Sequence, residues 1–414
     1  MNLKKIKSYA GELLYLLSSI VLPGIGFITS ILVAKFVDPK DNGLIESYFL
    51  ILPYLGFLQL GVFNGLNRNI AFYKAKNELS KVNLQVNTSL YVSRAVAIIS
   101  IIFVLIFVII NNNSYKLLDY FAITGVLIIS VLSPIALHID TTFRSGQDFK
   151  KLGALKLYEA GLQLLLTPLL VFFKGYGKVL MNTGKVIINA ILRLKNSPYK
   201  LEAKFDFKSY KELLSVGFPL LFGGYLFILF TIADQSIIGL NLGSEQLGYY
   251  FLSKLVLTIM LLIPSSLTSI LYPKASALFG TYGKPSSLRK FFWNSLLINF
   301  IVLSFIGLII YFSIDFIVFN YIPKYLPGVE AAKINVITGF SFLSIGPGVI
   351  MGVIRKNRFY IFLVGLSLLA MWGVSFFTKI TSIEQVAYYR CIISLILSIG
   401  TIFYSYYLTF SKHE

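Results

Sequence analysis

Long apolar runs separated by short polar segments dominate this chain of 414 residues. A helix needs roughly 20 apolar residues to cross a bilayer, and a backbone in lipid must satisfy its own hydrogen bonds. We therefore expect an all-α integral membrane fold of about twelve transmembrane helices. Their predicted bounds are 13–36, 43–66, 88–110, 119–141, 152–173, 176–193, 213–240, 247–271, 291–313, 331–354, 358–378 and 384–410.

The composition supports a membrane location. Hydrophobic residues make up 56% of the chain and charged residues only 13%, and the mean hydropathy is +0.77. Soluble domains are roughly 45–50% apolar and about 25% charged. Because so few polar residues cannot cover a globule in water, the remaining apolar surface is predicted to face lipid.

The net charge of +19 follows the predicted helices. In a soluble protein this charge would suggest nucleic acid as a partner, but in a membrane protein Lys and Arg gather in cytoplasmic loops. With the N-terminus inside, one set of alternate loops and adjoining helix ends holds 24 basic residues, Arg193 among them, and the other set holds 7, among them Lys178. We therefore predict that both termini are cytoplasmic and that nucleic acid is not a partner.

The longest loop, 194–212, is basic and lies at the midpoint of the chain. We interpret it as a cytoplasmic linker between two six-helix lobes, 1–193 and 213–414. A shift of 205 residues aligns Gly43 with Gly248, each just before a long helix. Two related halves with a substrate path at their interface are common among secondary transporters.

Several basic residues fall inside the apolar runs, where each charge costs roughly 2.5–3.5 kcal/mol. Lys254 and Arg390 each lie on a polar stripe of a predicted helix, and Lys185 lies on the least apolar helix, 176–193. Such cations are expected to face a cavity and bind an anionic head group. For Lys254 the alternative is a lysine that extends to the membrane interface.

Two carboxylates, Asp234 and Glu159, also lie inside predicted helices. A buried carboxylate suits a coupling proton or sodium ion. A structural ion pair is the alternative for each: Glu159 follows Lys156 by three residues, and Asp234 lies at about the same predicted depth as Lys254.

The first helix contains the sequence LPGIG, with Pro23, Gly24 and Gly26. Proline removes a backbone hydrogen bond and glycine loosens the turn, so we expect a bend here. It would serve either as a transport hinge or as an inert kink.

The sequence gives little support for cofactor or enzyme chemistry. Cys391 is the single cysteine, and His138 and His413 are the two histidines, so a metal site of the usual spacing is not expected. GTYGKPSS at Gly280 lacks the spacing of a phosphate-binding loop. We predict a transporter without a cofactor, driven by H+, Na+, the membrane potential or the gradient of its substrate.

Two segments carry a family resemblance. They are ILVAKFVDPKDNGLIESYFLILPYLGFLQLGVFNGLNRNIAFY (31–73) and LLSVGFPLLFGGYLFILFTIADQSIIGLNLGSEQLGYYFLSKLVLTIMLLIPSSLTSILYPKAS (213–276). The Gly-Phe-Pro start, the central Asp234, the LGSEQLGYY turn and the final YPKAS resemble the multidrug/oligosaccharidyl-lipid/polysaccharide (MOP) exporter superfamily. Within it, the chain resembles the bacterial polysaccharide-biosynthesis flippases of O-antigen (lipopolysaccharide) and capsule pathways.

The resemblance implies two lobes around a central cavity, as in multidrug and toxin extrusion (MATE) transporters, located in the bacterial inner membrane. It also implies an undecaprenyl-diphosphate-linked oligosaccharide as substrate, membrane lipids as surroundings, and a polysaccharide polymerase and chain-length regulator as partners. Scattered cations suit a diphosphate. The candidate substrate-binding residues are Lys254, Arg68, Arg94, Lys185 and Arg390.

Two other functions remain open at this stage. An ion-coupled multidrug exporter of the same superfamily would be favoured by an excess of acids in the helices, but the predicted helices contain more bases than acids. A membrane polysaccharide polymerase or ligase would be expected to carry a large outer loop, and all predicted outer loops are short.

Overall fold

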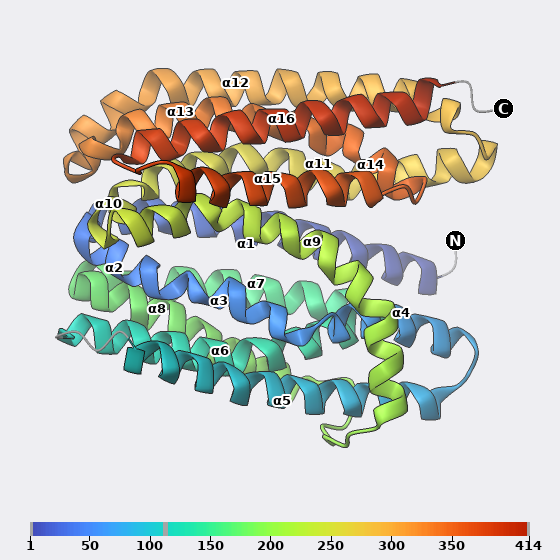
Figure 1. The fold of residues 1–414 in the computed structure, drawn as a ribbon. Coiled ribbons are helices and arrows are strands. Elements are labelled where there is room, and N and C mark those ends of the chain that lie inside the picture. Colours follow the sequence, from blue (N-terminus) through green and yellow to red (C-terminus); the bar gives the residue numbers. More distant parts are fainter. Residues whose placement is uncertain (1–2, 111–114, 412–414) are drawn as a thin grey trace. The chain divides into compact units, whose positions relative to one another are not determined.

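The computed structural model describes residues 3–110 and 115–411, and over this part of the chain the regular structure is helical, without strands (Figure 1). The α-helices are α1 (Leu3–Phe36), α2 (Pro39–Phe49), α3 (Ile51–Leu55), α4 (Val62–Ala75), α5 (Leu79–Ile110), α6 (Leu117–Ser145), α7 (Phe149–Leu166), α8 (Pro168–Lys195), α9 (Phe207–Asn241), α10 (Ser244–Tyr249), α11 (Phe251–Tyr282), α12 (Arg289–Tyr321), α13 (Val329–Gly339), α14 (Ile345–Val353), α15 (Arg358–Phe377) and α16 (Ile383–Phe410). Four 3-10 helices join some of them: η1 (Gly56–Gln59), η2 (Pro285–Leu288), η3 (Pro323–Gly328) and η4 (Phe340–Ser344). His413 lies outside the described residues.

Within the described residues, nine helices are long and apolar enough to cross a bilayer. Two further helix pairs meet the same test together, each with a bend. Residues 39–59 and 62–75 meet at 48°, whereas 149–166 and 168–195 meet at 94°. The all-α membrane fold predicted from the sequence is therefore confirmed, and the number of crossings depends on the two bent pairs.

The second bent pair contains a chain reversal. Inside α8, Lys174 has φ 48° and ψ −120°, which no helix contains. A Cβ placed on Gly177 would lie 1.9 Å from the carbonyl oxygen of Leu169, so the backbone folds back tightly on itself here. The predicted helices 152–173 and 176–193 meet at this reversal. If the first bent pair is counted as one crossing and the second as two, these three and the nine helices give the predicted twelve.

The first bent pair differs from its prediction. A single helix over 43–66 was expected, but α2, α3, η1 and α4 divide this region. Leu60 and Gly61 both have left-handed backbone, with φ of 49° and 89°. A Cβ on Gly61 would lie 2.4 Å from the carbonyl group of Gly217, so only glycine allows this approach to α9.

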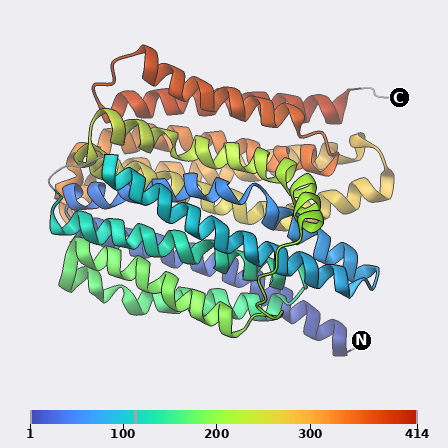
Figure 2. The ribbon, with the colours of Figure 1, turned by 60° about the horizontal axis from the view of Figure 1, so that its bottom comes forward.

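Contacts within the chain define two compact units. Unit 1 comprises Met1–Val37 and Leu44–Tyr225, and unit 2 comprises Asp38–Gly43 and Leu226–Glu414. Helix α9 therefore contributes to both units. The assignment of 194–212 as the linker between lobes stays a prediction. In unit 1, α1 packs against α7 and α5 lies beside α6, as both ribbon views show (Figures 1 and 2).

The two glycines aligned by the sequence shift contact each other in unit 2. A Cβ on Gly43 would lie 1.8 Å from the carbonyl oxygen of Ser244, and one on Gly248 would lie 1.8 Å from that of Pro39. The first turn of α2 and helix α10 thus cross with their backbones in contact. A side chain on either glycine would clash with the backbone of the opposite helix, so this crossing requires glycine at both positions.

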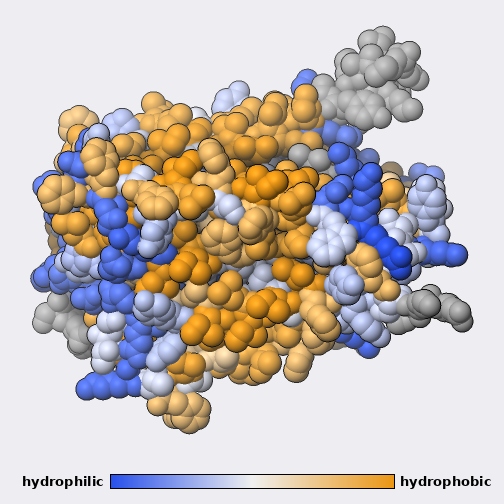
Figure 3. All heavy atoms as spheres, turned by 90° about the horizontal axis from the view of Figure 1, so that it is seen from above, coloured by the Kyte–Doolittle hydropathy of each residue, from blue (hydrophilic) through white to orange (hydrophobic). Residues whose placement is uncertain are grey.

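The surface agrees with burial in lipid. Figure 3 shows a broad apolar band between two ends at which polar residues gather. On α12 the side chains of Phe305, Phe312 and Phe319 are all more than 60% exposed. Exposed apolar surface of this extent is not tolerated on a soluble monomer, but it is the normal surface of a helix in hydrocarbon.

Candidate functional site

The described residues of unit 1 hold a three-residue ion cluster between α6, α7 and α8, in which the arginine is buried and the two acids are half-buried. The Arg193 guanidinium, only 6% exposed, donates from Nε to Asp140 Oδ1 at 2.7 Å and from Nη2 to Asp140 Oδ2 at 3.1 Å. Nη2 also donates to Glu159 Oε2 at 3.1 Å. Two carboxylates, each about 20% exposed, therefore share one fork-shaped cation, which gives each of them a charged partner.

Two predicted site residues meet beside this cluster. Lys185, eight residues before Arg193 on α8, donates from Nζ to Gln163 Oε1 at 3.4 Å. Gln163 is one turn after Glu159 on α7, and Lys185 lies within electrostatic range of Glu159. The least apolar helix thus places its polar residues against α7.

The predicted pairing of Lys156 with Glu159 is wrong. Lys156 Nζ donates to Ser19 Oγ at 3.0 Å and lies 4.4 Å from the centre of the Tyr15 ring. Glu159 is held instead by Arg193, a residue that the sequence places at the cytoplasmic end of a helix and that we had counted with the loops. The long-range partners of Arg193 could not be identified from sequence spacing.

A second buried pair in unit 1 was also missed. Lys178 Nζ lies 2.6 Å from Glu46 Oε1, and both side chains are largely buried. Lys178 lies at the outer end of the predicted helix 176–193 and, in the structure, inside α8, just after the chain reversal. The sequence feature that could have revealed this pair is Glu46, the one acidic residue in the predicted helix 43–66.

Arg68 and Arg94 differ from these buried groups. Both side chains are exposed, on α4 and α5 respectively, and the Arg68 guanidinium lies 5.8 Å from the centre of the Phe72 ring. Among the described residues, the partners of the Arg193 cluster do not include either arginine. Unit 1 therefore brings together Lys185 and Glu159 but not the other two predicted residues.

Unit 2 buries a different cluster around Asp234, which is 1% exposed. Tyr250 donates its hydroxyl to Asp234 Oδ2 at 2.8 Å, and the backbone N–H of Gln235 donates to Oδ1 at 2.9 Å. Asn335 on α13 donates from Nδ2 to the Tyr250 oxygen at 3.1 Å. Tyr250 joins α10 to α11, so three helical segments converge on one carboxylate.

Arg390 lies at the edge of the same cluster. Its Nη1 donates to the backbone carbonyl of Phe230, one turn before Asp234, and its guanidinium lies 4.1 Å from the centre of the Phe230 ring. The side chain is 3% exposed, and within the described residues its Nε has no hydrogen-bond partner. The structure thus brings Arg390 close to the carboxylate for which we had predicted a separate role.

Lys254 is half-buried on α11, one turn after Tyr250. Its Nζ lies 6.0 Å from the centre of the Phe251 ring. The predicted alternative of an Asp234–Lys254 ion pair is wrong, because within the described residues the carboxylate takes its hydrogen bonds from Tyr250 and Gln235. Lys254 is therefore a neighbour of the cluster and not a member of it.

The remaining predictions from the sequence concern a hinge in α1 and metal binding. Helix α1 continues through Pro23 without a break in its helical backbone, and a Cβ on Gly24 would meet no atom within 4 Å. The hinge role of Pro23, Gly24 and Gly26 stays a prediction. Among the described residues, there is no group of three His, Cys, Asp or Glu side chains that could hold a metal ion.

Solved structures similar to this chain are membrane transporters. A MATE family transporter of the MOP superfamily matches in its inward-facing conformation with a TM-score of 0.69 and 12% identity, over 94% of this chain and 97% of that one. An outward-facing MATE structure matches with a TM-score of 0.65 and 12% identity, over 95% and 94% of the two chains. A third match is a MOP superfamily transporter from Pyrococcus furiosus, whose reverse binding-pocket polarity suggests a different function for that protein. Its TM-score is 0.62 and its identity 13%, over 95% and 94%.

At 11–13% identity these likenesses establish the fold. A comparison with curated proteins finds no match. The sequence profile of the polysaccharide biosynthesis protein family matches residues 32–330, which is most of the chain. The chain is thus a multi-pass membrane protein with the fold of the MOP-superfamily transporters, and it belongs to the polysaccharide biosynthesis protein family.

Proposed function

We propose that this protein is a flippase that moves undecaprenyl-diphosphate-linked oligosaccharide repeat units across the bacterial inner membrane by alternating access. The observation that carries the proposal is a transporter fold in a polysaccharide biosynthesis family. An oligosaccharide diphosphate cannot cross hydrocarbon unaided, because its polar groups would lose their hydrogen bonds to water. A biosynthetic route that builds such a unit inside the cell and uses it outside needs a transporter.

For the substrate diphosphate we propose Lys254 as the first contact. It is half-buried and lies one turn after Tyr250 of the Asp234 cluster. Lys185, also half-buried, is the second candidate. Arg68 and Arg94 are exposed and suit capture of the head group, whereas Arg390 is tied to a backbone carbonyl and suits positioning of α9.

For coupling to H+ or Na+ we infer that Asp234 is better suited than Glu159. The direct hydrogen-bond donors to Asp234 are a tyrosine hydroxyl and a backbone N–H, both neutral. Glu159 is held by the charge of Arg193. A carboxylate with neutral donors can change its charge without leaving an ion-pair partner uncompensated.

The proposal extends to the setting of the protein. Both termini are placed in the cytoplasm, since the basic loops then lie inside. A polysaccharide polymerase and a chain-length regulator are the proposed partners on the outer side, because they would consume the flipped unit. The polysaccharide built from the flipped units is O-antigen or capsule.

Transport by the purified protein in liposomes tests the function. We expect the protein to expose a lipid-linked oligosaccharide to a lectin in the opposite compartment much faster than protein-free liposomes do. Lys254→Ala should slow this at least about tenfold, since it removes a charged contact. Lys290→Ala, an exposed lysine at the start of α12, is the matched control and should behave as wild type.

Two outcomes contradict the proposal. Transport of a cationic dye without exposure of the oligosaccharide would indicate a multidrug exporter instead. Lengthening of the glycan chain by the purified protein would indicate a polymerase. Normal exposure in Lys254→Ala would leave the flippase intact and overturn only the role of that lysine.

A further inference from the structure

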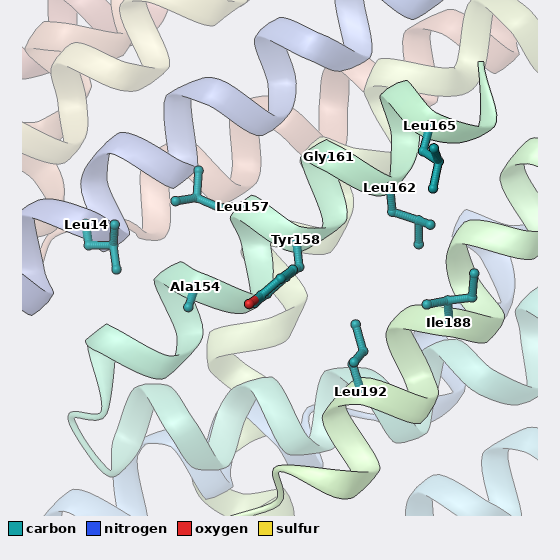
Figure 4. Close-up of a pocket in the computed structure, with 9 residues that line it drawn as sticks. All are labelled: Leu14, Ala154, Leu157, Tyr158, Gly161, Leu162, Leu165, Ile188 and Leu192. Carbon is teal, nitrogen blue, oxygen red and sulfur yellow. The ribbon is translucent and has the colours of Figure 1, made fainter. Parts of the chain in front are cut away.

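Unit 1 has an open apolar groove on α7, bordered by α1 and α8 (Figure 4). It encloses about 570 Å³, within the range of ligand pockets. Leu162 of α7 and Ile188 of α8 point into the space between the two helices (Figure 4). Leu165 and Tyr158 on its wall are 74% and 67% exposed, so the groove opens to the outside of the helix bundle.

The length of the groove matches one leaflet of a membrane. Its α7 wall runs from Ala154 to Leu165, a rise of about 16 Å at 1.5 Å per residue. The hydrocarbon core of a bilayer is about 30 Å thick, so one leaflet contributes ~15 Å. The groove therefore spans the depth of the acyl chains on one side of the membrane.

The end of the groove near Ala154 and Leu192 is basic. Lys150 precedes Ala154 by one turn of α7, and Lys195 follows Leu192 by one turn of α8, so each lysine lies on the face of a groove residue. Both lysines are exposed, and neither forms an ion pair with another described residue. This is the end that the positive charge distribution assigns to the cytoplasm.

The floor of the groove is a glycine. A Cβ placed on Gly161 would meet no heavy atom within 4 Å, although this residue lies in the middle of α7. Glycine in a helix interior costs roughly 1 kcal/mol relative to alanine. Here no close contact with protein backbone requires it, in contrast to Gly153 on the same helix, whose Cβ would lie 2.9 Å from Tyr15 N.

We propose that this groove is a binding site for an anionic phospholipid of the cytoplasmic leaflet. One acyl chain lies over Gly161 between Leu162 and Ile188, and the phosphate lies between Lys150 and Lys195. The lining offers a sugar almost no polar partner, which excludes the oligosaccharide as occupant. This site is independent of the proposed transport function and would remain if the transported substrate were a different one.

Native mass spectrometry of the full-length protein in detergent tests the site with two lipids of identical acyl chains, phosphatidylglycerol and phosphatidylcholine. Each lysine near a membrane surface favours an anionic lipid about fivefold, so two predict a preference of about thirtyfold for phosphatidylglycerol. The Lys150→Ala/Lys195→Ala double variant should reduce this preference to near one. Equal binding of both lipids to the wild type would overturn the proposal.

Filling the groove tests the acyl-chain position. Gly161→Leu should weaken phosphatidylglycerol binding at least about tenfold, since leucine occupies the space of several methylene groups. Gly373→Leu on α15 is the matched control, because a Cβ there also meets no atom within 4 Å. It should bind within about twofold of wild type.

Both variants replace an unconstrained helical glycine, so both should fold, which thermal unfolding checks. Unchanged lipid binding in a folded Gly161→Leu protein would overturn the site. So would displacement of the bound lipid by polyprenyl phosphate alone, or a dimer whose formation Gly161→Leu abolishes.

Discussion

The buried charges of the two units are arranged in opposite ways. In unit 1, Arg193 holds Asp140 and Glu159 through charge-assisted hydrogen bonds. In unit 2, Asp234 is bound by neutral donors, and Arg390 donates to a backbone carbonyl. In unit 1, opposite charges join three helices. In unit 2, the hydrogen-bond partners of Asp234 and of Arg390 are neutral groups.

The difference has an energetic consequence. Removing one member of a buried ion pair leaves its partner charged in a medium that solvates it poorly, which costs about 3–5 kcal/mol. Removing a partner from a neutral hydrogen bond costs only about 1–3 kcal/mol. Unit 1 is therefore expected to use its charges for stability, and unit 2 to keep a carboxylate whose charge can change during transport.

The largest effect is expected from Arg193→Met. It leaves Asp140 and Glu159 without their shared cation and should lower the free energy of unfolding by about 3–5 kcal/mol. Arg390→Met should lower it by about 1–2 kcal/mol, because it breaks one hydrogen bond to a neutral acceptor and one cation–π contact. Denaturant unfolding in detergent measures both.

The triple variant Arg193→Met, Asp140→Asn, Glu159→Gln is the control for this interpretation. It removes the carboxylate charges together with the cation, so much of the lost stability should return. Equal destabilisation by Arg193→Met and Arg390→Met would break the comparison between the units.

Neutralising each acid without changing its shape separates stability from coupling. Asp234→Asn keeps an acceptor oxygen for only one of the two donors, the Tyr250 hydroxyl or the Gln235 N–H, and should cost about 1–2 kcal/mol. Glu159→Gln weakens a charge-assisted bond to Arg193 and should cost about 1.5–3 kcal/mol. Transport in liposomes should lose its dependence on a proton or sodium gradient only in Asp234→Asn. Gradient dependence that survives there would exclude Asp234 as the coupling site.

Tyr250→Phe tests the same carboxylate from the side of its donor, with an effect smaller than that of Arg193→Met. The hydroxyl bridges Asp234 and Asn335, and its loss leaves a buried carboxylate oxygen without that donor, at a cost of about 2 kcal/mol. Tyr249→Phe next to it is the control, because the partner of its hydroxyl among the described residues is the exposed Glu245, at 3.2 Å. Its cost should stay below about 0.5 kcal/mol. Equal costs in thermal unfolding would show that the Asp234 cluster is not cooperative.

The fold followed from the sequence to the extent that it depends on local hydropathy. The length of the apolar runs identified the membrane helices, because each crossing must satisfy its own backbone. The same signal could not locate the break at Leu60 and Gly61, which a close approach of Gly217 requires. It also could not show that α1 continues through Pro23, since proline lowers helix stability without determining the packing around it.

The candidate sites were predicted less completely for a related reason. The polar stripe of Lys254 also includes Tyr250, one turn earlier, and Tyr250 is the residue that contacts Asp234. Arg193 was assigned to a loop because it lies at the end of a helix, but its partner Asp140 is 53 residues away in sequence. Partners at such distances are set by helix packing, which a single sequence does not show.

A half-buried carboxylate held by a backbone N–H and, among the described residues, without a cation on it, Asp206, provides the weakest case for comparison with the two clusters. It precedes α9 in the predicted linker, and its Oδ2 accepts from the backbone N–H of Ser209 at 2.7 Å. The hydrogen bonds from the Ser209 side chain and backbone hold the pKa of Asp206 below its ordinary value. A carboxylate with a lowered pKa stabilises the folded state above the pKa of the unfolded chain, near 3.9, and this contribution is lost as the pH falls through the folded-state pKa.

Asp206→Ala should therefore lower the midpoint of thermal unfolding slightly at pH 7, and the difference from wild type should shrink as the pH falls below about 4. Asp206→Asn keeps an oxygen for the helix N-terminus without a charge, so its difference from Asp206→Ala should not depend on pH. The effect should be the smallest of those described, since Asp206 loses one N-cap contact whereas Arg193→Met strips two carboxylates of their shared cation. A loss in Asp206→Ala as large as that in Arg193→Met would mean that the shared cation is not what distinguishes these carboxylates.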